Sequence, residues 1–502
     1  TSAFEFYSDQ FTFARRGDYF VNPNMMTPEL MALVKQLDSL ELIDRMPEMT
    51  MQQLGMALQR GAGSSEAEQV FVAALRIFFF YANSGRGLNF IPPTDPENET
   101  WASVGDVLLE SLENKDQRAE NKERLGPLKK LVESAKTDQF TAELKAFADH
   151  QAKLANDRGE GTRAGLEVHL FNAKYFFWSL FLFIGGFIVM ALSWLLPGTR
   201  VSKVLLITAA IIAFIAMCLD ITGITLRSII RDRPPITNLY DTILFITATA
   251  VFLGLFLELV TRIGVGTLIA LLSGVGGMFL SIKFEAHEAT DTMGQLVAVL
   301  DTNFWLATHV TIINVGYAAG LLAALLGIVY IVGRFVCLCI KKHDKPTRDI
   351  FKSINRMTYG IVCFCLFFSL VGTVLGGIWA NYSWGRFWGW DPKENGALMI
   401  CLWTLVILHG RMGGMLREIG INVCSILLGM IVAFSWWGVN NLEVGLHSYG
   451  FTEGVDTWLK GSYAVGLFFM LMGFPLFLYE RNKRLEKKRK AAEKSQAAGA
   501  TA

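Results

Sequence analysis

The chain has 502 residues, of which 52% are hydrophobic and 18% are charged, and its formal net charge at pH 7 is +1. A nearly neutral chain carries no general basic surface for a polyanion, so we expect no nucleic-acid partner. The apolar residues are concentrated after about residue 172, in runs that an ordinary soluble domain does not contain. The composition therefore favours a membrane protein with a polar N-terminal part.

Residues 1–172 are polar and charged and are expected to form a mostly helical soluble domain. Three prolines fall between residues 88 and 101, so this segment is predicted to be extended or to form turns. Residues 127–156 are a candidate for one charged helix. No cluster of catalytic side chains occurs in this part, which favours a spacer or docking domain.

Residues 173–480 contain nine apolar runs, each close to the ~20 residues with which an α-helix crosses the hydrocarbon core of a bilayer. We therefore predict an all-α fold, a polytopic membrane helix bundle with about nine transmembrane helices. The expected spans are 176–196, 204–226, 242–260, 264–284, 305–336, 359–379, 394–412, 421–439 and 463–479.

The distribution of Lys and Arg predicts the orientation, because cytoplasmic loops of membrane proteins are enriched in these residues. Basic residues gather in alternate loops and in the tail at 481–502, which is therefore expected to be cytoplasmic. Counting back through nine spans places residues 1–172 and 379–394 outside. Because an external N-terminal domain needs an export signal, we expect a cleaved signal or a membrane-spanning portion upstream of Thr1. The expected location is the bacterial inner (plasma) membrane, with a thylakoid membrane as the alternative.

Residues 379–394, WANYSWGRFWGWDPKE, concentrate aromatic side chains more than any other stretch. Four tryptophans are predicted to lie in one loop and to form a platform for a large flat ligand: Trp379, Trp384, Trp388 and Trp390. Gly385 and Gly389 would allow close backbone approach, and Asp391 is expected to be structural or to contact the loop backbone. The alternative is an aromatic belt at the membrane interface.

Two histidines are predicted to reach the same outer face as this stretch. His309 lies near the outer end of the fifth span, and His447 lies in the outer loop after the eighth. Two imidazoles on opposite sides of a planar ring are the ligands of a bis-His haem, so haem b is the ligand we expect. Two unrelated interfacial histidines are the alternative.

A third histidine, His409, lies fifteen residues after Glu394 in the seventh span. At 1.5 Å per residue it is about 22 Å deeper, toward the predicted cytoplasmic side. It is a candidate iron ligand at an inner haem site, although a packing role is the alternative. No other histidine of the chain is placed to pair with it. Arg231 and Arg233, at the start of the third span, could contact haem propionates or face water.

The segment WGRFWGWDPKE resembles the tryptophan-rich WWD signature, WGxxWxWD, of haem-handling proteins in cytochrome c biogenesis. Four further segments resemble the CcsA (ResC) type of this family. The segments around His309 and His447 resemble those with its two external histidines, and the segment around His409 resembles that with its transmembrane histidine. Residues 233–241 resemble its RxPxTNLYE segment. The resemblance covers about residues 200–480, whereas residues 1–172 have no clear counterpart.

This resemblance implies the haem-presenting subunit of a cytochrome c synthetase, with haem lyase activity. Haem would pass from an inner site that includes His409 to an outer site with His309 and His447 as axial ligands. The WWD segment at 379–394 would pack the ring, and an apocytochrome c with a CxxCH segment would receive it through thioethers. The resemblance also implies a CcsB (ResB)-like partner, separate or fused upstream, that supplies the second inner ligand. No residue is assigned as catalytic.

Two other functions fit the same sequence features. The chain could act as a haem relay or exporter without ligase activity. A different class of function is that of a secondary transporter or quinone-binding membrane protein, with the tryptophan-rich stretch as a lid. The transporter reading predicts internal repeats, and no clear repeat is found in the sequence.

Overall fold

The computed structural model describes residues 89–93, 100–135, 137–159, 161–288, 292–293, 302–341, 344–439, 442 and 455–500. His447, predicted as an axial ligand, lies outside the described residues. The chain divides into two compact units, Thr1–Gly165 and Leu166–Ala502, and each is described by itself.

The described part of the first unit is a short antiparallel hairpin followed by helices. The hairpin pairs β1 (Asn89–Ile91) with β2 (Ala102–Ser103). The helices are α6 (Val104–Glu113), α7 (Arg118–Ser134), α8 (Phe140–Asp157) and, extending across the boundary between the units, α9 (Gly161–Ala173). The extended conformation predicted near residue 90 is confirmed by β1.

The single helix predicted for residues 127–156 is wrong, because the chain turns between α7 and α8. The amide and the hydroxyl of Thr137 both donate hydrogen bonds to the carbonyl of Ser134, at 2.8 and 2.9 Å. This turn occupies the carbonyl at the end of α7 and redirects the chain into α8. A threonine hydroxyl competes with the helical pattern in this way.

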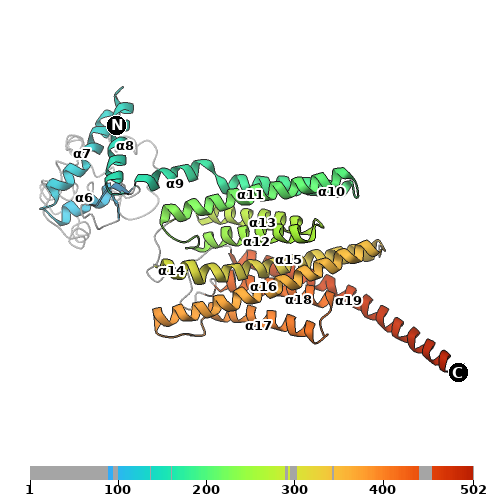
Figure 1. Cartoon of the computed structure of the whole chain (residues 1–502). Coiled ribbons are helices and arrows are strands. Elements are labelled where there is room, and N and C mark those ends of the chain that lie inside the picture. Colours follow the sequence, from blue (N-terminus) through green and yellow to red (C-terminus); the bar gives the residue numbers. More distant parts are fainter. Residues whose placement is uncertain are drawn as a thin grey trace, which may run out of the picture. The chain divides into compact units, whose positions relative to one another are not determined.

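The second unit is a bundle of long helices (Figure 1). Within the described residues, nine helices are long and apolar enough to cross a membrane, which confirms the predicted all-α, polytopic bundle. The elements are α10 (Tyr175–Leu195), α11 (Arg200–Arg231), α12 (Leu239–Thr261), α13 (Val265–Glu288), α14 (Asn303–Trp305), the π-helix η5 (Leu306–Val310), α15 (Thr311–Cys339), α16 (Lys345–Trp384), α17 (Pro392–Met412), α18 (Glu418–Ala433), the π-helix η6 (Phe434–Gly438) and α19 (Val455–Ala500).

Polar side chains start several of these helices directly after short connections. The side chains of Thr199, Asn238 and Asp344 accept hydrogen bonds from backbone amides in the first turns of α11, α12 and α16. These amides have no partner within the helix, so each cap satisfies a donor that would otherwise need water. The connections can therefore stay short, which fixes the order in which the helices pack.

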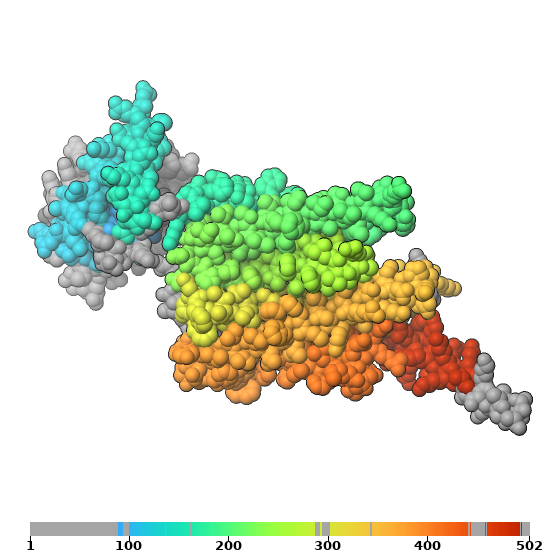
Figure 2. All heavy atoms as spheres, viewed as in Figure 1, coloured from blue at the N-terminus to red at the C-terminus, as the bar shows by residue number. Residues whose placement is uncertain are grey.

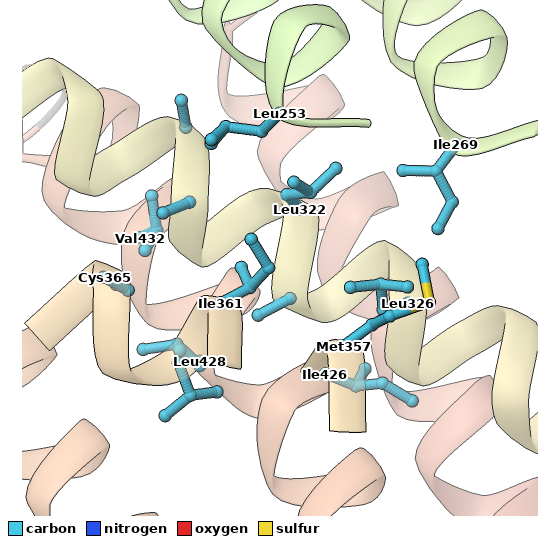
Figure 3. Packing of buried hydrophobic residues seen from close by; sticks show 14 of the residues in the cluster. Leu253, Ile269, Leu322, Leu326, Met357, Ile361, Cys365, Ile426, Leu428 and Val432 are labelled. Carbon is cyan, nitrogen blue, oxygen red and sulfur yellow. The ribbon is translucent and has the colours of Figure 1, made fainter. Parts of the chain in front are cut away.

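Helix α15 contributes heavily to the larger apolar core (Figure 3). Its side chains Leu322 and Leu326 are fully buried. They lie among residues of neighbouring helices, such as Leu253 of α12, Ile361 of α16 and Ile426 of α18. Helices α10 and α17 lie at opposite edges of the bundle (Figures 1 and 2). A residue carried on α15 is therefore held between several helices, whereas α17 exposes one face.

The structure changes the predicted boundaries of the tryptophan-rich stretch. Helix α16 continues to Trp384, and α17 begins at Pro392. Trp379 and Trp384 are therefore helical, and the prediction that they lie in a loop is wrong. The residues before Gly385 are compatible with a helix, and the helix ends where Gly385 adopts a left-handed conformation, with φ +68°. Only residues 385–391 form the connection.

Candidate functional site

His309 lies one turn inside the helix formed by α14, η5 and α15. It belongs to the π-helical segment η5, a geometry that is frequent at functional sites. Its Nδ1 lies 2.8 Å from the carbonyl oxygen of Gly372 on α16. A carbonyl can only accept, so Nδ1 carries the proton and Nε2 carries the lone pair. The backbone of α16 thus holds His309 in the tautomer that binds iron through Nε2.

A glycine on α16 makes room for this imidazole. A Cβ atom placed on Gly376 would lie 2.6 Å from Cε1 of His309 and 3.1 Å from its Nδ1. Such a contact is closer than a real Cβ makes, so any side chain at this position would displace the ring. Gly372, one helical turn earlier, supplies the carbonyl that binds Nδ1, and a Cβ there would lie 2.9 Å from Cα of Ile313, so it lets α16 approach α15 closely.

A cluster of aromatic side chains lies beside His309. The ring of Trp379 lies 5.7 Å from the imidazole, between ring centroids. Trp305 stacks on Trp379 at 6.4 Å with an interplanar angle of 13°, and Tyr382 lies 6.1 Å from Trp305. The Nε1 atom of Trp379 is buried and has no hydrogen-bond partner among the described residues. The cluster therefore offers aromatic surfaces and one unused donor beside the histidine.

Trp305 and Tyr382 were not predicted as site residues. Trp305 is four residues before His309, and Tyr382 is three residues after Trp379, spacings that place each pair on one helix face. The signal for Trp305 was therefore present within the fifth predicted span. Tyr382 follows the same spacing only if the helix continues past Trp379, where the predicted span ends.

The connection between α16 and α17 carries the remaining tryptophans. Trp388 and Trp390 contact each other edge to face, with ring centroids 6.1 Å apart. Trp390 has a φ of +56°, which is uncommon for a residue with a large side chain. The side-chain amide of Asn395 donates to its carbonyl at 3.0 Å. Trp390 is 69% exposed and Trp384 is 48% exposed, so both residues are available to a ligand.

The two predicted glycines have different roles. Gly385 has a positive φ, and a Cβ there would meet no atom within 4 Å. It adopts the left-handed conformation that ends α16, and because the space beside it is open, close approach of a ligand to its backbone stays a prediction. At Gly389 a Cβ would overlap the guanidinium of Arg386. The absence of a side chain at Gly389 therefore makes room for Arg386, and close approach of a ligand to its backbone stays a prediction.

Asp391 and Glu394 form a capping box at the start of α17. The carboxylate of Asp391 accepts from the amide of Lys393 at 2.9 Å. Glu394 Oε2 accepts from the amides of Gly389 and Asp391, at 2.8 and 3.1 Å. Both carboxylates therefore satisfy backbone donors. This geometry makes Asp391 a structural residue that fixes the shape of the connection.

Lys393 connects α17 to η6. Its Nζ donates to the carbonyl of Trp436 at 2.9 Å, and Trp436 Nε1 donates to Thr242 Oγ1 on α12 at 2.8 Å. The start of α17 is thus tied through η6 to α12. These bonds anchor the connection that carries Trp388 and Trp390 to the rest of the bundle.

His409 lies at the other end of α17, about 27 Å from Asp391 at 1.5 Å per residue. Its Nδ1 lies 2.9 Å from the carbonyl of Leu405, so Nε2 again carries the lone pair. The imidazole is exposed on the same helix face as Leu402, Leu405 and Val406. The structure therefore does not bring His409 together with His309, and it places His409 on an open face at the edge of the bundle.

The arginines that begin the third predicted span differ in their surroundings. Arg231 Nη2 and Arg227 Nη2 lie 2.8 and 3.0 Å from the buried carboxylate of Asp241, and Arg231 also bonds to Thr237. Arg231 is thus part of a buried ionic cluster, and the water-facing alternative does not describe it. Arg233 is half-buried and donates to Asn303 Oδ1 at 3.3 Å, which links this loop to the start of α14.

The described residues contain no group of three or more His, Cys, Asp or Glu side chains that would hold a metal ion by itself. A ligand that brings its own iron in a flat ring needs only axial nitrogens and apolar walls. Three features of the site suit such a ligand. The Gly372 carbonyl holds the imidazole of His309, Trp305 and Trp379 stack beside it, and the Nε1 donor of Trp379 is unused among the described residues. The fold and the site define a multi-pass helical membrane protein with a histidine and tryptophan site at one end of its bundle.

A family model described as "Cytochrome C assembly protein" matches residues 236–447. The cytochrome c biogenesis protein CcsA of Chlorella vulgaris is 30% identical over 271 residues, which cover 47% of this chain and 84% of that protein. CcsA of Chlamydomonas reinhardtii is 31% identical over 226 residues, covering 43% of this chain and 61% of that protein.

A similar match extends to a larger protein. Protein NrfI of Wolinella succinogenes is 31% identical over 252 residues, which cover 48% of this chain and only 26% of that protein. This chain thus spans less than two thirds of NrfI and of the Chlamydomonas protein. By these matches the chain belongs to the CcsA-type cytochrome c assembly family, which assigns it to cytochrome c biogenesis.

Proposed function

We propose that this chain presents haem b for attachment to apocytochrome c. The observation that carries the proposal is the hydrogen bond from His309 Nδ1 to Gly372, which orients Nε2 for iron beside the stacked Trp305 and Trp379. Membership in a cytochrome c assembly family supports the same chemistry.

His309 and His447 are proposed as the axial ligands of this outer site. An axial imidazole whose second nitrogen donates to a carbonyl is a better electron donor to iron, so the bond to Gly372 strengthens ligation. Four tryptophans would pack the ring: Trp379, Trp384, Trp388 and Trp390. Asp391, Gly385 and Gly389 would keep the connection in the shape that presents them.

The reaction at this site is the addition of two thiols to two vinyl groups. The histidine of an incoming CxxCH segment replaces one axial histidine. Each cysteine sulfur then forms a bond to the inner carbon of a vinyl group, and its proton goes to the outer carbon, so no oxidant or reductant is consumed in the addition. The protein contributes chiefly by holding the thiols and vinyls in register, with iron chemistry set by the axial ligands.

His409 is proposed as one ligand of an inner haem site. It is exposed on an apolar face of α17 at the edge of the bundle, where a second protein can reach it. A CcsB-like partner, separate or fused upstream, would supply the second ligand. The exposed face formed by Leu402, Leu405 and Val406 would then be covered by that partner.

We place the protein in the bacterial inner membrane, with the basic tail at 481–502 in the cytoplasm. The domain at 1–172 would lie outside, together with the WWD stretch at 379–394, which is the outer part of the haem-handling membrane domain at 173–480. Haem would then travel from His409 toward His309, across most of the membrane.

The test is covalent haem on an acceptor. The full chain is expressed with its CcsB-like partner and a small CxxCH acceptor, and haem that survives denaturing electrophoresis is measured. We expect His309→Ala to abolish acceptor labelling, while His150→Ala, at an exposed position of α8, leaves it unchanged. Haem bound to the chain with an unlabelled acceptor would favour a relay over a synthetase. Labelling that survives in His309→Ala would contradict the proposed ligand.

A further inference from the structure

A small pocket lies between three helices at the end of the bundle where α15 ends and α16 begins. Among its lining residues are Arg334 and Leu338 of α15, Thr347 and Arg348 of α16, and Leu476 and Tyr479 of α19. Arg334 lies near the end of α15 and Arg348 in the first turn of α16, so the two arginines line the pocket from consecutive helices joined by a short connection. The pocket is remote from His309, because it lies at the opposite end of α15.

Positive charge exceeds negative charge around this pocket. Arg334 forms an ion pair with Glu480, and its guanidinium carbon lies 5.5 Å from the ring centroid of Phe351. Lys483 Nζ lies 5.6 Å from the centroid of the Tyr479 ring. The side chain of Arg348 is exposed and makes no hydrogen bond or ion pair within the described part of the chain. Three cations, Arg334, Arg348 and Lys483, therefore lie at or beside the pocket. Two carboxylates are near them: Glu480 and Glu418, which accepts from the Tyr330 hydroxyl at 3.1 Å.

The other lining is apolar and continues onto the outer surface of the helices. Leu338 and Leu476 line the pocket, and Phe477 and Ile340 beside them are 46% and 61% exposed. Tyr479 lines the pocket between its charged and apolar parts, and tyrosine is typical of the boundary between hydrocarbon and water. A ligand for this pocket has an anionic head and an apolar tail.

We propose that this pocket binds the phosphate headgroup of an anionic membrane lipid. Arg334 and Arg348 would hold the phosphate oxygens, since a guanidinium presents two parallel donors to a phosphate. The Thr347 hydroxyl supplies a further donor, and Leu338 and Leu476 contact the first part of the acyl chain. Basic pockets between transmembrane helices bind lipid headgroups in this way. Glu480 competes with the phosphate for Arg334.

The test is lipid retention by the full chain, purified in detergent and measured by native mass spectrometry with added phosphatidylglycerol or phosphatidylcholine. We expect phosphatidylglycerol to be retained preferentially. Arg348→Gln should lower its retention about fivefold, the factor by which one Lys or Arg near the surface strengthens the binding of an anionic lipid. The matched control is Arg356→Gln, an exposed arginine of α16 outside the pocket. Glu480→Gln is expected to raise retention, because it releases Arg334.

Three results would overturn the proposal. Equal losses in Arg348→Gln and Arg356→Gln would show that only general surface charge attracts the lipid. Equal retention of phosphatidylglycerol and phosphatidylcholine would show that the pocket does not recognise the negative charge of the headgroup. Displacement of the lipid by millimolar inorganic phosphate would show that the pocket takes the free anion and makes no use of the tail. The Glu480→Gln variant adds no buried charge, so it tests the site even where Arg348→Gln folds poorly.

Discussion

The carbonyl oxygen of Gly372 lies 2.8 Å from Nδ1 of His309, although the two residues are 63 positions apart in the chain. This single bond fixes the tautomer of the imidazole and the direction of Nε2. Because the acceptor is a backbone carbonyl, a substitution at Gly372 acts on the bond only by moving α16, since a Cβ there would lie 2.9 Å from Cα of Ile313. The position of the histidine thus depends on how closely α16 approaches the start of α15.

Gly376→Ala is expected to impair the outer site by moving His309. Its Cβ would lie 2.6 Å from Cε1 of the imidazole. A displacement approaching 1 Å can lower the rate of a positioned reaction by about 100-fold, so we expect thioether formation to fall by about 10-fold to 100-fold. The control is Gly360→Ala on the same helix, where a Cβ meets no atom within 4 Å. Equal activity of the two variants would show that the close contact is unimportant.

Trp379→Phe is expected to weaken haem retention while keeping an aromatic ring. The variant loses the Trp379 indole N–H, which has no partner within the described residues, and much of the stacking on Trp305. Aromatic pairs contribute about 1 kcal/mol, so we expect roughly fivefold weaker binding in a haem titration. Trp178→Phe, on the exposed face of α10, serves as the control. Unchanged affinity in Trp379→Phe would remove this residue from the site.

Asp391 is expected to act through the fold of α17. Asp391→Asn preserves an N-cap acceptor, whereas Asp391→Ala removes it at a cost of about 1 kcal/mol. We therefore predict that Asp391→Asn retains haem and that Asp391→Ala lowers the midpoint of thermal unfolding in detergent. Loss of haem in Asp391→Asn, with an unchanged midpoint, would instead make the carboxylate a direct contact.

The ionic cluster at the start of α12 is expected to be important for stability. Asp241 is 1% exposed and pairs with both Arg227 and Arg231. Asp241→Asn leaves two buried guanidinium groups without their carboxylate, and breaking such a pair costs about 3–5 kcal/mol. We expect a clear fall in the unfolding midpoint. Asp232→Asn removes the same charge at an exposed left-handed position that Asn tolerates, and it should have little effect. Similar midpoints for the two variants would contradict the buried pairing.

The helices were predictable because the length of an apolar run is a strong local signal. The nine spans were identified for that reason, and Gly385 marks the end of α16 at the place where a left-handed residue is required. The interruption between α7 and α8 was missed because it depends on the hydroxyl of one threonine, Thr137. The continuation of α16 through Trp384 was missed because an aromatic-rich segment resembles a loop platform and a helix end equally well.

The candidate site was predictable only in part. His309 and the tryptophans could be singled out by residue type and by their expected side of the membrane. The acceptor Gly372 and the space at Gly376 could not, because both arise from the contact between two helices that are distant in sequence. Trp305 was overlooked although it lies one turn from His309. Tertiary contacts of this kind are set by packing and leave no periodic pattern in the sequence.

The most direct test of the account is the absorption spectrum of the purified full chain with its CcsB-like partner. We predict the spectrum of a six-coordinate, bis-His haem in the wild type. The double variant His309→Ala/His447→Ala should lose the outer haem, while His150→Ala keeps it. A haem content and spectrum unchanged in the double variant would contradict the central claim that these two histidines hold haem at the outer site.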